Sequence, residues 1–155
     1  MLDTKNFILK TGVRTFEAAA YLRKLGADTV EVKKLFATSM STYQGRTSLV
    51  SAAEIYNNCA IVLTDGNNID NIKIIAPQTA DDLLNIKGVV CSFVWYLQNG
   101  IVNFSARSLG AVNVQLIMEA LGGGGHLTMA GAQLDNISLE DAKIELIKAI
   151  DNFFE

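Results

Sequence analysis

The spacing of apolar residues predicts three helices near the start of the chain. Between Thr15 and Gly26, apolar side chains recur at the three- and four-residue intervals that place them on one helical face. Asp28, with a glutamate three residues later, is typical of the first turn of a second helix, which should end near Phe36. A third apolar stripe predicts a helix over residues 41–57. The first third of the chain is therefore expected to be helical.

The pattern changes after the third helix, where runs of strand length begin. Residues 59–63 form a continuous apolar run, which is typical of a strand covered on both faces. Residues 89–97 and 101–106 are rich in β-branched and aromatic side chains, and Asn99 and Gly100 lie between them. An Asn-Gly pair between two such runs is the strongest short-range signal for a β-hairpin. The sequence therefore predicts a hairpin that turns at these two residues.

Helices and one further strand complete the predicted order. A proline restricts the residue before it to extended backbone, so we expect an element boundary at Pro77 and a short helix over 79–86. Apolar stripes predict a helix over 114–121 and a final helix that starts at Ser138, with a strand near 132–134 before it. This order is typical of the α/β class, in which helices pack on a mixed β-sheet.

Composition and charge narrow the functional classes. Half of the 155 residues are hydrophobic, which is enough to bury the core of about one globular domain. Thirteen basic and sixteen acidic residues give a net charge of −3, which argues against binding of long nucleic acid through a basic track. Cys59 and Cys91 lie in apolar runs, which favours buried thiols over a disulfide or a zinc site. No apolar stretch reaches the length of about 18 residues expected of a transmembrane helix.

A run of four glycines followed by His126, the single histidine, is the sharpest candidate for a binding site. One glycine is enough to end a helix, and each further glycine in a structured element costs about 0.5–1 kcal/mol relative to alanine. Backbone without Cβ atoms can point several N–H groups at a phosphate. Gly123, Gly124 and Gly125 would then hold the anion, His126 would contact a phosphate or a base, and a helix over 127–131 would add its amides. A flexible loop with an incidental histidine explains the same residues equally well.

Arg107 and Ser108 stand at the predicted end of the hairpin's second strand. The planar guanidinium of an arginine suits a phosphate or a purine edge, and the serine adds a hydroxyl. A solvated arginine beside a turn serine is the more common explanation for such a pair. Only one predicted helix separates these residues from the glycine run, so the short turn before that helix could bring both to one edge of the sheet.

Taken together, these motifs resemble the DHHA1 domain. The segments that carry the resemblance are Ser105–Gly110, residues 113–115, residues 117–119, Gly122–His126 and residues 130–132. Residues 2–7 and 11–18 resemble the last motif of the DHH catalytic domain. The whole chain is therefore similar to the C-terminal DHH/DHHA1 region of the membrane-anchored bacterial cyclic di-AMP phosphodiesterases.

The resemblance implies a division of the chain into three parts. Residues 1–40 would be the remnant of a DHH catalytic domain, residues 41–57 a linker helix, and residues 58–155 a DHHA1 substrate-binding domain with a mixed sheet and packed helices. The parent enzyme would use Mn2+ to hydrolyse cyclic di-AMP to the linear dinucleotide. It would be anchored in the bacterial cell membrane, with this part in the cytoplasm.

The resemblance also implies roles for individual residues. Arg107, Ser108 and the run Gly123–His126 would bind the nucleotide, and Asp3 would be a manganese ligand. Two-metal hydrolysis needs ions about 3.5–4 Å apart, each held by several ligands, and one aspartate cannot supply them. The chain alone is therefore expected to bind no manganese and to be inactive without the DHH domain of the same protein.

Two other functional classes remain open at this level. The glycine run with its histidine also fits the DHHA1 module of an oligoribonuclease, a pAp phosphatase or another single-stranded nucleic-acid phosphoesterase, where it would act as a binding module. A dimerisation domain whose glycine run packs against a second copy, giving a homodimer, is the third class. Titration with cyclic di-AMP, the linear dinucleotide and a short oligo-A distinguishes the three.

Overall fold

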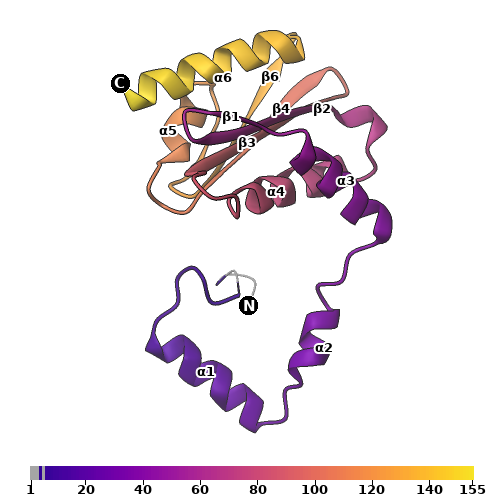
Figure 1. The fold of residues 1–155 in the computed structure, drawn as a ribbon, viewed down its shortest axis with the longest axis vertical. Helices are drawn as coiled ribbons and strands as arrows, with labels where there is room; N and C mark the ends of the chain where they lie inside the picture. Colours follow the sequence, from indigo (N-terminus) through magenta and orange to yellow (C-terminus); the bar gives the residue numbers. More distant parts are fainter. Residues whose placement is uncertain (1–3, 5) are drawn as a thin grey trace. The chain divides into compact units, whose positions relative to one another are not determined.

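A six-stranded mixed sheet with helices on both faces forms the larger of two compact units, which runs from Ser39 to Glu155 (Figure 1). The smaller unit ends at Thr38. The computed structural model describes residue 4 and residues 6–155. No helix in that described part is long and apolar enough to cross a membrane. The α/β class predicted from the sequence is confirmed.

The smaller unit contains two helices, and neither has a buried residue. α1 spans Val13–Lys24 and α2 spans Thr29–Lys34. Asp28 caps α2 as predicted, because its carboxylate accepts hydrogen bonds from the backbone N–H groups of Val30 (2.7 Å) and Glu31 (3.4 Å). Several large apolar side chains of these helices are more than half exposed. Capping and local hydrogen bonds therefore define these helices, without burial of an apolar stripe.

The third helix is shorter than predicted, and a strand follows it. α3 spans Met40–Ser51, and β1 (Glu54–Tyr56) pairs antiparallel with β2 (Cys59–Asp65). The helix predicted over 41–57 is therefore wrong in its last residues. The cause is the asparagine pair at 57–58, whose φ angles of 46° and 62° are those of a two-residue hairpin turn that asparagine tolerates better than most residues.

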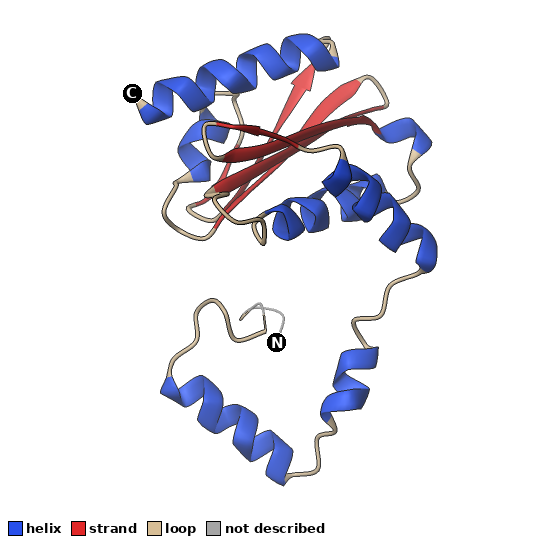
Figure 2. Ribbon diagram, viewed as in Figure 1, coloured by secondary structure: helices blue, strands red, loops and turns tan. Residues whose placement is uncertain are grey.

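The remaining strands extend the sheet away from β2 (Figure 2). Their bounds are β3 Cys91–Gln98, β4 Ile101–Ser108, β5 Gly124–His126 and β6 Met129–Asp135. The order across the sheet is β1-β2-β3-β4-β6-β5, and within it β2 and β3 run parallel whereas the other neighbours are antiparallel. β3 and β4 form the predicted hairpin, with φ of 53° at Asn99 and 80° at Gly100.

Different helices cover the two faces of the sheet. α3 and α4 (Ile72–Leu83) pack on one face, against buried apolar residues of β2 and β3. α5 (Val114–Glu119) and α6 (Leu139–Phe154) pack on the other face, over a core that includes Trp95 and Phe104. The sheet therefore separates two hydrophobic clusters.

α4 continues through Pro77, where the sequence predicts a boundary. A short 3₁₀ helix, η1 (Gly66–Asn68), precedes α4. The buried face of α4 consists of Ile72, Ile75, Ala76, Thr79, Ala80 and Leu83. Burial of each large apolar side chain contributes about 1.5–3 kcal/mol, and together these exceed the cost of about 3 kcal/mol for a proline inside a helix. The predicted boundary and the separate helix over 79–86 are therefore wrong.

Cys59 and Cys91 are buried free thiols, as the sequence predicts. They are register partners at the start of the parallel strands β2 and β3, and the Cys91 thiol donates a hydrogen bond to the Cys59 sulfur over 3.0 Å. Both belong to the core on the α5 and α6 face.

We expect Gly100→Ala to lower the free energy of unfolding by about 1–2 kcal/mol, because its φ of 80° is costly for a residue with a Cβ. A Cβ at this position would meet no atom within 4 Å, so the loss reports backbone conformation alone. Urea unfolding measures the change. Gly100→Asn is the control and should lose less, since asparagine adopts this conformation more readily; equal losses would contradict the assignment.

Candidate functional site

One half of the sheet exposes a polar face on the side that carries α4. Along β4, half-buried residues alternate with buried ones, and the buried ones belong to the core under α5 and α6. The half-buried residues point to the opposite face, which continues across β6 and β5. We define this open face by its members: Asn103, Ser105, Arg107, Gly124, His126, Met129, Gly131 and Gln133. Three of the candidates singled out from the sequence, Arg107, Gly124 and His126, belong to this face.

The strand register brings Arg107 and His126 into one row of the open face. Arg107 pairs with Met129 across β4 and β6, and Met129 pairs with His126 across β6 and β5. Because neighbouring strands lie about 4.8 Å apart, the two residues are about 10 Å apart at the backbone. The prediction that the hairpin end and the glycine run meet in the sheet is confirmed. In the next row, Gly131 and Gly124 leave a stretch without side chains.

Arg107 is held in place by the protein, with its guanidinium beside the carboxylate of Asp81. Its side chain is 15% exposed, its Nη1 donates a hydrogen bond to the Ala106 carbonyl (2.8 Å), and its Nε lies 3.4 Å from Asp81 Oδ1. The buried Nε donates no hydrogen bond to any residue in the described part of the chain. Burial lowers the pKa of Arg107 and the Asp81 carboxylate opposes that shift, so the guanidinium stays charged near neutral pH.

The glycine run forms a helix end and an edge strand. Gly122 has a φ of 74° and ends α5, where its N–H donates to the Glu119 carbonyl. Gly124–His126 then pairs with β6 as strand β5. The helix predicted over 127–131 is wrong, because a turn leads from His126 into β6. The run is therefore neither a flexible loop nor the start of a helix.

Three of the four glycines have a structural reason to lack a side chain. A Cβ at Gly123 would overlap the carbonyl oxygen of Gly131, and a Cβ at Gly125 would lie 2.5 Å from the carbonyl oxygen of Met129. Gly122 has positive φ. Gly124 differs, because a Cβ there would meet no atom within 4 Å and its φ lies outside the left-handed region. Gly124 is therefore the one position of the run whose glycine the described structure does not require.

Ser108 lies on the opposite face of β4 from Arg107. It is 2% exposed, and its hydroxyl donates to the carbonyl oxygens of Val112 (2.6 Å) and Leu127 (3.2 Å). The same oxygen accepts a hydrogen bond from the Gly110 N–H over 3.3 Å. The structure therefore gives Ser108 the role of joining the loop after β4 to the β5–β6 turn, and its hydroxyl does not reach the open face.

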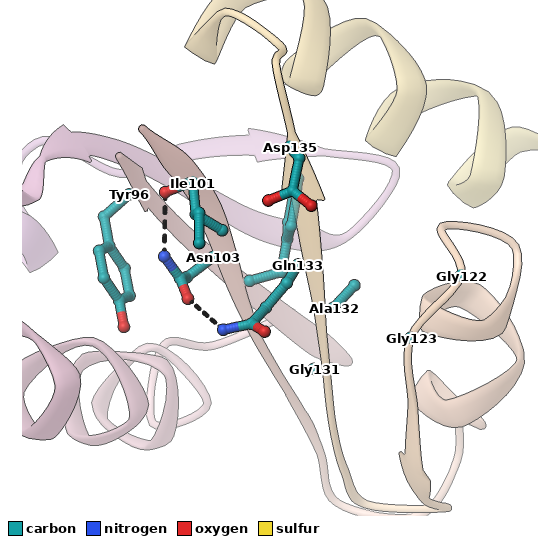
Figure 3. Close-up of a pocket in the computed structure, with 10 residues that line it drawn as sticks. Tyr96, Ile101, Asn103, Gly122, Gly123, Gly131, Ala132, Gln133 and Asp135 are labelled. Atoms are coloured by element: carbon teal, nitrogen blue, oxygen red, sulfur yellow. Dashed lines mark hydrogen bonds between the residues drawn. The ribbon is translucent and has the colours of Figure 1, made fainter. Parts of the chain in front are cut away.

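A hollow of about 600 Å³ lies between the glycine run and the Asn103 end of the open face, and the open-face residues that line it are Asn103, Gly131 and Gln133 (Figure 3). Gly123 and Gly131 line one part of it, and Tyr96, Asn103 and Gln133 line another. The two amide side chains form a hydrogen-bonded pair, in which Gln133 Nε2 donates to Asn103 Oδ1 over 2.7 Å. The hollow thus combines bare backbone with oriented polar groups.

Sequence reasoning missed Asn103 and Gln133 as site residues. The available signal was the period of two in a strand, because Asn103 lies four residues before Arg107 and therefore faces the same way. Gln133 could not be found in this manner, since its place beside Asn103 depends on the pairing of β4 with β6.

The described residues do not form a site that fits a pair of manganese ions. Within residue 4 and residues 6–155, no three histidine, cysteine, aspartate or glutamate side chains lie together as metal ligands. Asp3, the metal ligand predicted by resemblance, lies outside the described residues. We therefore assign no metal chemistry to the open face.

Comparison with known proteins identifies the fold and then the family. A solved exopolyphosphatase-related protein from Bacteroides fragilis matches 99% of this chain and 47% of its own, with a TM-score of 0.89 and 23% identity, which is a likeness of fold. The family model for the DHHA1 domain matches residues 57–155. The chain therefore belongs to the DHHA1 domain family.

Curated relatives match the chain along its whole length. It is 51% identical over 157 residues to the cyclic-di-AMP phosphodiesterase GdpP of Geobacillus thermodenitrificans. It is 45% identical over 156 residues to the cyclic-di-AMP phosphodiesterase PdeA of Listeria monocytogenes. Both matches cover 100% of this chain and 24% of the relative, so the chain spans about a quarter of the length of these proteins.

The glycine geometry predicts unequal effects of alanine along the run. Gly123→Ala and Gly125→Ala should each lower the free energy of unfolding by about 1–3 kcal/mol, because the new methyl group overlaps β6. Gly124→Ala should change it by less than about 0.5 kcal/mol, because its Cβ would meet open space. Urea unfolding of the three variants measures this difference. Equal losses at all three positions would show that the β5–β6 packing is misassigned.

Ser108→Ala should lower the free energy of unfolding by about 1–3 kcal/mol, because the Val112 carbonyl oxygen loses its buried hydrogen bond to the hydroxyl. Ser105→Ala is the matched control, since Ser105 is a half-buried serine on the open face of the same strand. Thermal unfolding should show a clear drop in Tm for the first variant and little change for the second. A larger drop in Tm for Ser105→Ala than for Ser108→Ala would contradict the structural role of Ser108 and make it a candidate for ligand binding again.

Proposed function

We propose that the open face binds cyclic di-AMP, or the linear dinucleotide formed from it, as the substrate-binding domain of a phosphodiesterase. Arg107 would pair with a phosphate, His126 would donate to a phosphate or stack on a base, and Gly124 would let the nucleotide approach the backbone. The names of relatives that are 45–51% identical over the whole chain support this choice of substrate.

The observation that carries the proposal is the single row that holds Arg107 and His126 beside a row of glycines. Two donor side chains about 10 Å apart at the backbone can approach one nucleotide from two sides. A guanidinium offers a planar fork of donors that matches the phosphate oxygens. The position without a structural reason for its glycine, Gly124, lies two residues before His126 on β5, in the next row and opposite Gly131.

Cleavage would be carried out by a DHH domain of the same protein, with Mn2+ bound there. In that arrangement the DHHA1 domain holds the dinucleotide and the DHH domain attacks the phosphodiester bond. We further propose that the intact protein is anchored in the bacterial cell membrane, as the resemblance implies. Since the chain carries a net charge of −3, a short nucleotide suits it better as a ligand than a long nucleic acid, which binds through a basic track.

Three variants test the proposed binding face. Arg107→Lys, His126→Ala and Gly124→Ala should each weaken binding of cyclic di-AMP to the 155-residue chain, by about 1–3 kcal/mol where a charged hydrogen bond is lost. Isothermal titration calorimetry with cyclic di-AMP, the linear dinucleotide and a short oligo-A measures the affinities. Arg23→Lys is the control, because Arg23 is an exposed arginine of α1 whose Nη1 donates to the Ala27 carbonyl just after that helix. Unchanged affinity in all three variants would remove the proposal.

The chain by itself should not hydrolyse cyclic di-AMP, with or without added manganese. The reason is that the described residues offer no cluster of three metal-ligating side chains. Chromatographic separation of the linear product after incubation with Mn2+ measures turnover. Hydrolysis that disappears on chelation and returns with manganese would show that the metal centre lies in this chain.

A further inference from the structure

A hydrogen-bonded ladder of amides crosses the hollow of the open face. Asn103 Nδ2 donates to the Ile101 carbonyl oxygen over 3.0 Å, and Gln133 Nε2 donates to Asn103 Oδ1 over 2.7 Å (Figure 3). Asn103 is half-buried and Gln133 is exposed at the outer end of the ladder. The ladder therefore leads from the backbone of β4 to a side chain that faces solvent and the hollow.

The Ile101 carbonyl at the inner end of the ladder fixes the orientation of both amide groups. A backbone carbonyl can only accept a hydrogen bond, so the nitrogen of the Asn103 amide must face Ile101 and its oxygen must face Gln133. The nitrogen of Gln133 must then face Asn103, which turns Gln133 Oε1 away from the ladder. The hydrogen bond to Asn103 uses one N–H of Nε2 and leaves Oε1 and the second N–H of this exposed side chain available. Gln133 thus presents an acceptor and a donor side by side.

We propose that Gln133 recognises the adenine base of the bound nucleotide and, with Asn103, selects adenine over guanine. On its Watson–Crick edge, adenine offers an amino donor at N6 next to an acceptor at N1, and a glutamine amide can bind this pair with two hydrogen bonds. Guanine offers an acceptor at O6 in place of the amino group, so Gln133 Oε1 would face a second acceptor. This inference rests on the function proposed above and names the residue that sets its base specificity.

The charge distribution along the open face supports placing the base at this end. Arg107 lies four residues along β4 from Asn103, about 13 Å away in a strand. Asp135, two residues beyond Gln133 on β6, also lines the hollow, and its carboxylate repels phosphate while favouring an amino group. The Tyr96 ring borders the hollow on the other side of Asn103, in register with it on β3. The phosphate therefore belongs at the Arg107 end and the base at the Gln133 end.

Two variants separate base recognition from general packing. Gln133→Leu keeps the side-chain size but removes both hydrogen bonds to adenine, and should weaken binding of cyclic di-AMP by about tenfold or more. Asn103→Leu removes the group that fixes the direction of Gln133, so its amide can turn over and pair with the O6 acceptor and the N1–H donor on the Watson–Crick edge of guanine. This variant should lower the preference for cyclic di-AMP over cyclic di-GMP. The fold-change in that preference should exceed the fold-change in the affinity for cyclic di-AMP itself.

Calorimetric titration of the 155-residue chain with both cyclic dinucleotides measures these affinities. Gln115→Leu is the matched control, because Gln115 is a glutamine of α5 that bonds Glu119 away from the open face, and both affinities should stay unchanged. If Arg107→Lys weakens binding but Gln133→Leu and Asn103→Leu leave the adenine preference intact, the inference is overturned and the proposed function stands. If the unmodified chain binds neither dinucleotide, both are overturned.

Discussion

The pairing of β4 with β6 is the constraint on which the rest of the larger unit depends. Its register runs from Ile101 opposite Asp135 to Arg107 opposite Met129. A slip by one residue would turn the buried side chains of β4, including Val102 and Phe104, out of the core and the polar ones into it. The apolar side of β4 therefore determines the position of every polar group on its other side. The core under α5 and α6 and the open face are two consequences of one register.

The elements with strong local signals could be predicted from the sequence. Asn99 and Gly100 specify a tight turn by backbone conformation alone, so the β3–β4 hairpin follows from two residues and their flanking runs. The juxtaposition of Arg107 with His126 could also be predicted, because one short helix separates their strands. Elements that depend on distant partners could not. β1 exists because Asn57 and Asn58 turn the chain back onto β2, and α4 continues through Pro77 because its burial against the sheet outweighs the lost hydrogen bond.

The glycine run shows why residue type alone could not separate binding from packing. Composition predicts an unusual backbone over the whole run, whereas the structure divides its members by the space around each. Gly123 and Gly125 lie against β6 with no room for a Cβ, Gly122 ends a helix, and Gly124 has open space. Ser108 is the converse case, because its sequence position beside Arg107 suggests a ligand contact, yet the alternation of a strand points the two side chains to opposite faces.

The orientation of the Gln133 amide depends on the whole amide ladder and not on Gln133 alone. An isolated glutamine on a surface can turn its amide over at little cost, and can then pair with the Watson–Crick edge of either adenine or guanine. The ladder removes that freedom, because the Ile101 carbonyl accepts only and each amide must follow the one before it. The register of β4 and β6 places Gln133 beside Asn103 and so completes the ladder. The same backbone pairing that aligns Arg107 with His126 at one end of the face therefore orients the donor and the acceptor at the other end.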